Sequence, residues 1–103
     1  MRIQVVSLQR ARRVIPRRRK GLRAAVVELA PGAAMAWHST GLREELLIAL
    51  GGRVRVEVRT ASRTRRASLR AGQCVFLPRG TRHCVVNPSM RKARYLYVTA
   101  SAR

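Results

Sequence analysis

Hydrophobic and polar residues alternate with a period of two along much of this chain, which is the pattern of strands with one buried face. The clearest case is residues 53–59, where three valines face one side and charged residues face the other. Residues 94–100 alternate in the same way, with both tyrosines and Thr99 on one face and Leu96 and Val98 on the other. Further strands are predicted over residues 1–8, 22–29, 44–50, 67–69, 73–77 and 82–87. About eight short strands without a convincing helix predict an all-β sandwich or barrel.

The stretch between the first two predicted strands, residues 9–23, is the most basic part of the chain, with eight Lys and Arg side chains. Pro16 lies inside it and disfavours a continuous helix, so we expect a solvated loop. The length of 103 residues fits one domain. We therefore predict a single domain over residues 1–103, with an N-terminal strand and basic loop over 1–23 and the barrel over 24–100.

The net charge of +19 is extreme, because the chain has 23 Lys and Arg residues against four glutamates and no aspartate. Such a charge attracts nucleic acid, anionic lipid or small anions, or it is a solvated surface shaped by a genomic preference for arginine. The arginines are scattered and aromatic residues make up only 4% of the chain, which disfavours a specific nucleic-acid reader. No apolar run approaches the ~20 residues that span a bilayer. Residues 1–8 are too short and interrupted for a signal-peptide core, so we expect no membrane association and a cytoplasmic location.

Two stretches of the chain carry its candidate chemistry. The first contains Gly32, His38, Thr40, Glu45 and Gly52, and the second contains Gly72, Pro78, Gly80, His83 and Asn87. These stretches hold the only two histidines of the chain, each on a strand-like segment. Two imidazoles and one carboxylate are ligands that suit divalent transition metals.

Period-two geometry places these polar groups among apolar neighbours. Glu45 shares a face with Leu47 and Ala49, and His83 shares a face with Val85 and Asn87. A buried carboxylate is costly unless it is paired or bound to a metal. The alternation places Met35 and Trp37 on the opposite face from His38, where packing or a dimer interface is the favoured role. By the same argument Glu44 is a surface charge.

The order and spacing of the two stretches resemble the two motifs of the cupin superfamily, over residues 32–87. The second motif matches at every fixed position, whereas the first departs at Thr40, where the family usually has a second histidine. The resemblance implies a small antiparallel jelly-roll β-barrel with one divalent metal (Fe, Mn, Ni or Zn) on His38, Glu45 and His83. Thr40 is then close to the metal but outside bonding distance. Structural roles are expected for Gly32, Gly52, Gly72 and Gly80, which allow positive φ, for Pro78 in a turn, and for Asn87, which ties a loop through backbone hydrogen bonds.

The substitution at Thr40 leaves two outcomes open. The site keeps a metal on two histidines and one carboxylate, with open positions, or the protein is a metal-free barrel that binds a small molecule or acts as a sensory module. We favour a retained metal, because three inward-facing polar groups are preserved. The corresponding functions are a metal-dependent enzyme acting on a small organic anion, with the reaction type open, and a binding module without turnover. A third hypothesis is a non-specific nucleic-acid-associated protein using residues 9–23 and 53–70.

Two further expectations concern association and thiols. The stretch 44–50 is apolar on both faces, and a small barrel buries only one of them, so we predict a homodimer. Cys74 and Cys84 fit neither a CxxC nor a zinc-ribbon spacing, so we expect two reduced, partly buried thiols. A jelly roll would place their strands in different sheets.

Overall fold

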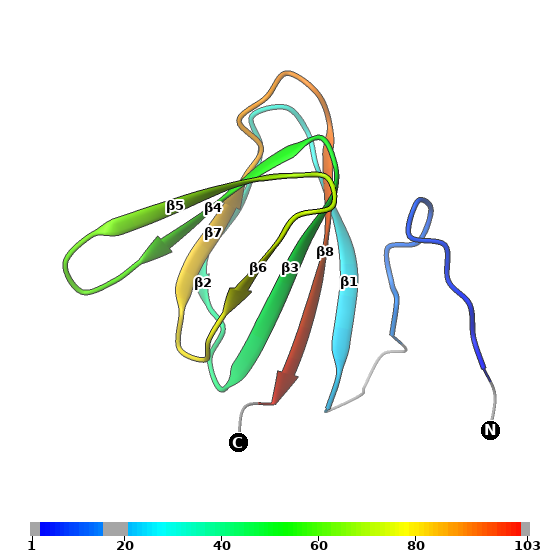
Figure 1. The fold of residues 1–103 in the computed structure, drawn as a ribbon, viewed down its shortest axis with the longest axis horizontal. Helices are drawn as coiled ribbons and strands as arrows, with labels where there is room; N and C mark the ends of the chain where they lie inside the picture. The colour runs from blue at the N-terminus through cyan, green and yellow to red at the C-terminus, as the bar shows by residue number, and fades with distance from the viewer. Residues whose placement is uncertain (1–2, 16–20, 102–103) are drawn as a thin grey trace.

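The computed structural model describes residues 3–15 and 21–101, which form eight strands and no helix. The strands are β1 (Arg23–Leu29), β2 (Ala34–Ser39), β3 (Arg43–Gly51), β4 (Arg53–Arg59), β5 (Thr64–Arg70), β6 (Cys74–Leu77), β7 (Arg82–Val86) and β8 (Ala93–Ser101). They make two four-stranded sheets in the orders β1-β8-β3-β6 and β2-β7-β4-β5, with every pair antiparallel (Figure 1). The predicted all-β, antiparallel jelly-roll barrel is confirmed. Within the described part of the chain, nothing is helical enough to traverse a bilayer.

The core lies between the two sheets, and it is built from the faces that alternation predicted. On β4, Val54 and Val56 are at most 1% exposed, and on β3 Leu47 and Ala49 are fully buried. Val85 of β7 packs in the same cluster. Because these valines and leucines occupy every second position, their strands can leave charged residues at the positions between them.

The strand predicted over residues 1–8 is wrong for the described residues 3–8, which belong to no strand. Ile3 is 83% exposed and Val5 is 95% exposed. The alternating pattern is present, but a strand also needs a partner edge, and residues 3–8 pair with no other described part of the chain. The segment is tied to the barrel further along, where Arg94 donates a hydrogen bond to the Leu8 carbonyl and Arg13 forms an isolated bridge with Ala25.

The described part of the predicted basic loop, residues 9–15 and 21–22, contains no strand, whereas Arg23 already begins β1. Residues 16–20 of that loop lie outside the described residues. Eight strands were predicted and eight are present, but they are not the same eight. The predicted N-terminal strand is absent from the described residues, and β2, which was not among the predicted strands, is present. Small residues and a bulge in β2 hide its alternation.

The turn glycines have the backbone conformation that was predicted, with φ of 76°, 71°, 89° and 72° at Gly32, Gly52, Gly72 and Gly80. Gly52, between β3 and β4, is also tightly enclosed. A Cβ placed there would lie 2.7 Å from the Lys92 carbonyl oxygen and 3.0 Å from the Ala93 Cα. Backbone cannot move aside easily, so this position excludes a side chain for two separate reasons.

Asn87 ties two loops together, as predicted, and is fully buried. Its side-chain amide donates hydrogen bonds to the carbonyl oxygens of Leu29, Ala30 and Arg91, at 3.1, 3.2 and 2.6 Å. Its Oδ1 accepts from the backbone N–H and the hydroxyl of Ser89, at 3.0 and 2.8 Å. The amide has two N–H groups, so one of them is shared between two of these oxygens. An aspartate has no N–H to donate, so the amide is what holds the end of β1 against the loop after β7.

The outward faces of the two sheets differ in chemistry. The strand registers place only apolar side chains and one thiol across the middle of the β1-β8-β3-β6 sheet, on its outer side: Ala24, Val26, Leu46, Ile48, Cys74, Phe76, Leu96 and Val98. Within this face Phe76 is 55% exposed and Leu46 is 38% exposed. The outer side of the other sheet is basic, and there Arg59 lies over the Trp37 ring at 5.0 Å. Trp37 therefore faces away from the predicted ligands, as expected.

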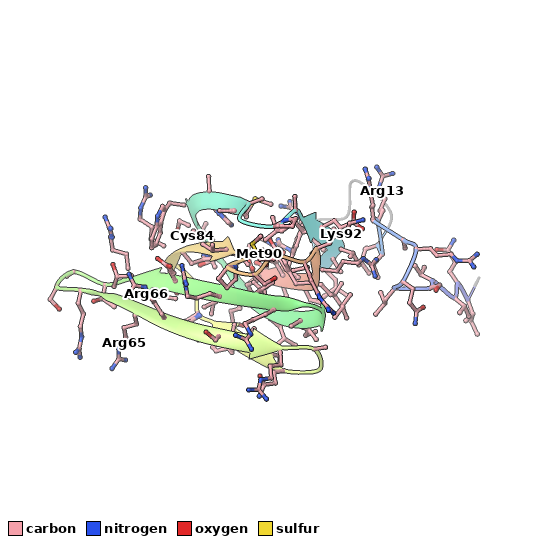
Figure 2. The ribbon with its side chains drawn as sticks, turned by 90° about the horizontal axis from the view of Figure 1, so that it is seen from above. Arg13, Arg65, Arg66, Cys84, Met90 and Lys92 are labelled. Carbon is pink, nitrogen blue, oxygen red and sulfur yellow. The ribbon has the colours of Figure 1, made fainter. Side chains whose placement is uncertain are left out.

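Among the described residues, the basic side chains are spread over the molecule and do not form one patch. Figure 2 shows Arg65 and Arg66 on the β4–β5 hairpin at one end, whereas Arg13 lies near the other end. Two of the three glutamates outside the barrel interior form ion pairs, Glu57 with Arg55 and Arg66, and Glu28 with Lys92 and Arg94. The predicted position of Glu44 on the surface is confirmed.

Candidate metal centre

Three strands from both sheets bring His38, Glu45 and His83 together inside one end of the barrel. One candidate ligand atom from each residue lies within 4.8 Å of the other two. His38 of β2 and His83 of β7 are register partners, with ring centroids 4.3 Å apart. Glu45 of β3 reaches them from the opposite sheet. The three residues come from distant parts of the sequence, so only the closed barrel makes them neighbours.

His83 is fully buried, and one of its ring nitrogens has no hydrogen-bond partner among the described residues. Its Nδ1 lies 3.1 Å from the Thr81 carbonyl oxygen. A carbonyl oxygen only accepts, so Nδ1 carries a proton and the unpartnered atom is Nε2, which presents a lone pair when the ring is neutral. A buried polar atom without a partner is costly, so its retention points to a ligand that the atom is built to meet.

His38 is held in the same way but at the open side of the site. Its Nδ1 lies 2.7 Å from the Ala36 carbonyl oxygen, so its Nε2 is likewise left as an acceptor. In metal sites a ligating histidine usually donates its other N–H to a backbone carbonyl, which fixes the ring and its tautomer. His38 is exposed, whereas His83 is buried, so the site is open to solvent on the His38 side.

Glu45 is the acidic member of the site and is only 8% exposed. Its Oε2 lies 3.6 Å from His83 Nε2, which is short enough for an ion pair but too long for a good hydrogen bond. Burial by itself would lower the pKa of His83, but Glu45 and the Thr81 carbonyl oxygen outweigh it and the pKa is raised. Burial and the nearby Glu45 carboxylate raise the pKa of Tyr95. Two imidazoles and one carboxylate whose ligand atoms lie within 4.8 Å of one another form a donor set that fits a divalent transition metal.

Thr40 lies beside the site, but its hydroxyl is used elsewhere. It donates a hydrogen bond to the Pro78 carbonyl oxygen and accepts one from the Thr81 backbone N–H, both at 2.9 Å. Thr40 therefore fastens the end of β2 to the turn that precedes β7. Since the Thr81 carbonyl orients His83, the residue at this motif position supports the site through the backbone.

A cavity of about 390 Å³ opens from the three candidate ligands to the surface. Its remaining lining comes from Arg23, Met35, Ser39, Thr40, Arg43, Val85, Tyr95, Tyr97 and Thr99. The alternation of residues 94–100 placed Tyr95, Tyr97 and Thr99 on one face, but nothing in the sequence linked that face to the site. Arg43 stands two residues before Glu45, so its shared face was visible in the sequence, whereas the approach of Arg23 depends on strand pairing.

The expectation that Met35 faces away from the ligands is wrong. Met35 and His38 both line the cavity, although they are three residues apart. The register of β2 against β7 shifts between these two residues, as at a β-bulge. A bulge adds a residue to one strand and reverses the alternation beyond it, so a strict period of two fails at this point.

The two cysteines lie in different sheets, as expected, on β6 and β7, and both are free thiols. The expectation that both are partly buried is wrong, because Cys74 is exposed and Cys84 is buried. Burial, with the Glu57 carboxylate nearby, raises the pKa of Cys84. Neither thiol is part of the candidate metal centre.

Comparison with known proteins agrees with this geometry. The family model described as "Cupin domain" matches residues 25–99. The chain belongs to the cupin family. A comparison with curated protein sequences gave no match.

Solved structures give the same fold. TT1209 from Thermus thermophilus superposes with a TM-score of 0.80 at 28% identity, over 96% of this chain and 98% of that protein. An oxalate oxidase superposes with a TM-score of 0.73 at 23% identity, and the CENP-C cupin domain of Drosophila melanogaster with 0.70 at 16% identity. The alignments cover 80% and 75% of this chain, which spans only 43% and 57% of those two proteins. At such identities the last two structures show a shared fold alone.

Proposed function

We propose that this protein is a metal-binding cupin that holds one divalent transition metal per chain on His38, Glu45 and His83. The observation that carries the proposal is the buried Nε2 of His83, which has no hydrogen-bond partner among the described residues and faces the Glu45 carboxylate. Both histidines have Nδ1 on a backbone carbonyl, which leaves Nε2 able to coordinate. Iron, manganese, nickel and zinc all suit this donor set.

We further propose that the metal centre acts on a small organic anion in the cavity, as a metal-dependent enzyme. A bound divalent ion would supply Lewis acidity at the positions that the protein leaves open. The chain contributes a buried inner wall at His83 and Val85, and an exposed side at His38. Arg23 and Arg43 make the cavity attractive to an anion.

A metal-free binding or sensory module is the second candidate. It is favoured by Thr40, which stands where the family has its second histidine and whose hydroxyl already has two backbone partners. A barrel of this kind would keep the cavity and its arginines but would use the buried histidine and glutamate as an ion pair. The two candidates differ in metal content, which can be measured directly.

Elemental analysis of protein purified without chelator tests the proposal. We expect about one transition-metal ion per chain in the wild type and a loss of nearly all of it in His83→Ala. Cys84→Ala is the matched control, because Cys84 is the next residue on β7, is also buried, and does not line the cavity. Circular dichroism should show that both variants keep the barrel. Wild-type protein that remains metal-free after incubation with each of the four ions would favour the binding module.

We also propose that two chains associate through the apolar outer face of the β1-β8-β3-β6 sheet. The support is the exposure of Phe76 on the edge strand β6 and of Leu46 on the neighbouring β3, in the rows of this face that carry no charged side chain. Monomeric proteins rarely leave large continuous apolar surfaces in water. A second copy of the same face would cover it with a self-complementary contact.

A further inference from the structure

Two arginines line the cavity that contains the candidate metal centre, one from each side of β8. Arg23 comes from β1 and Arg43 from β3, and both contribute to the cavity wall. Glu45 is the only carboxylate of this wall among the described residues. With a divalent ion bound, the two guanidinium groups and the ion outweigh that carboxylate by three positive charges. A cavity with this balance attracts an anion.

Strand register fixes where Arg23 stands. Arg23 is the register partner of Thr99, and Thr99 is the register partner of Glu45. Partners in antiparallel strands point to the same side, so the three residues form one row across the inner face of the sheet. Arg23 and Glu45 are two strand spacings apart, about 10 Å between Cα atoms. An arginine side chain can span much of that distance, so its guanidinium can reach a ligand held near Glu45.

Arg43 is fixed over the same row by hydrogen bonds. Its Nε donates to Thr99 Oγ1 at 2.8 Å, and one terminal nitrogen donates to the carbonyl oxygens of Thr99 and Gly21, at 2.9 and 2.5 Å. These three acceptors are neutral oxygen atoms, and the contacts hold the plane of the guanidinium in place through Nε and one terminal nitrogen. A group held in this way loses little further freedom when it binds a ligand.

The other walls of the cavity limit what the anion can be. Met35, Val85, Tyr95 and Tyr97 present mainly carbon to the interior. A volume of about 390 Å³ lies at the small end of the range for ligand pockets. Guanidinium groups pair with carboxylates and phosphates in planar, bidentate contacts. The apolar walls favour an organic acid with a short carbon chain over inorganic phosphate.

We infer that the cavity binds a small organic acid in a two-ended manner, with its carboxylate on Arg23 and Arg43 and a second oxygen group at the His38–Glu45–His83 centre. This inference rests on the proposed metal centre and adds to it the chemical class of the ligand and the residues that select it. The ligand class comprises short dicarboxylic, hydroxy and keto acids. A neutral analogue of the same shape lacks the group that the arginines recognise.

Calorimetric titration of the metal-loaded protein with lactate, malonate and succinate tests the inference. We expect at least one of these acids to bind, and we expect inorganic phosphate to bind more weakly than the acid with the highest affinity. If malonate is the acid that binds best, its neutral analogue malonamide should bind at least tenfold more weakly. Arg23→Gln should weaken the best acid at least tenfold. Arg53→Gln, which removes the same charge from an exposed position outside the cavity wall, should change its affinity by less than twofold.

The outcomes separate this inference from the proposed function, because metal content is measured on the same samples. A wild-type protein that takes up no metal overturns both. Metal-loaded protein that binds none of the three acids, or binds the best one equally in Arg23→Gln and Arg53→Gln, overturns only the inference. Arg43→Lys gives a second measurement, since it keeps the charge but replaces the anchored, planar guanidinium by a flexible ammonium group, and a several-fold weaker affinity is expected. An unchanged affinity in both Arg23→Gln and Arg43→Lys would contradict recognition by these arginines.

Discussion

Thr40 offers the sharpest test of how this site is supported, because its hydroxyl makes two hydrogen bonds that valine cannot make. Thr40→Val keeps the shape of the side chain but removes the bonds to the Pro78 carbonyl oxygen and from the Thr81 N–H. The Pro78 oxygen keeps another donor, the Thr81 hydroxyl at 2.6 Å. The partly buried Thr81 N–H loses the acceptor it has here, so its desolvation cost is no longer offset.

The magnitude follows from these contacts. Each lost hydrogen bond costs about 1 kcal/mol, and the uncompensated N–H raises the sum to about 2–3 kcal/mol for Thr40→Val. Thr40→Ser keeps both bonds and loses one methyl group, which costs under about 1 kcal/mol. For a domain near 100 residues, 1 kcal/mol corresponds to roughly 4–8 °C in Tm, so the valine variant should melt about 10–20 °C below the wild type.

Urea and thermal unfolding, both with a chelator present, measure this difference without any contribution from bound metal. A Thr40→Val protein whose free energy of unfolding lies within about 0.5 kcal/mol of that of Thr40→Ser would refute the assigned role of the hydroxyl. Metal titration adds a second readout, because Thr81 orients His83. Thr40→Val should bind metal more weakly than Thr40→Ser. Thr40→His should be destabilised without metal, like the valine variant, but should bind metal more tightly than wild type if the added imidazole becomes a fourth ligand.

The remaining predictions concern the turns, the surfaces and the thiols. In denaturant unfolding, Gly52→Ala should lower the free energy of unfolding by several kcal/mol and Gly72→Ala by only about 1–2 kcal/mol. Both glycines have positive φ, but only at Gly52 would an added Cβ meet backbone atoms. Equal losses in the two variants would contradict this close approach. Light scattering should show a homodimer at micromolar concentration, and Phe76→Glu should shift it toward monomer; a monomeric wild type would rule out the proposed apolar interface. Nucleic-acid binding, if measured by a gel shift with random RNA, should be independent of sequence and disappear at moderate salt; a complex that survives several hundred millimolar salt would favour a nucleic-acid function. Iodoacetamide should modify the exposed Cys74 quickly and Cys84 slowly, because Cys84 is buried and its pKa is raised; equal rates in mass spectrometry would contradict that burial.

Much of the site could be predicted from the sequence, because local pattern and residue chemistry are enough for it. The spacing of His38, Glu45 and His83 within two turn-bounded stretches indicated a shared site, and the structure brings their ligand atoms within 4.8 Å of one another. Alternation placed the valines of β4 in the core and Glu45 on the buried face of β3. That Asn87 would bond to backbone could be predicted from its residue type and its place at a loop, but its partners Leu29 and Ala30 come from a distant part of the sequence and were decided by the fold.

Only the tertiary structure decided which strands pair and how the cavity is lined. Alternation over residues 1–8 indicated a strand, but pairing requires a neighbouring edge, and the described part of that segment has none in the single chain. The bulge in β2 turned Met35 into the cavity, because one added residue reverses the side that a side chain faces. Arg23 reaches the site only because β8 lies between β1 and β3, and no feature of its own neighbourhood in sequence indicates that pairing. A period of two indicates which residues share a face within one strand. The order and register of the strands are set by contacts between distant segments. These contacts placed two arginines beside the histidines and the glutamate.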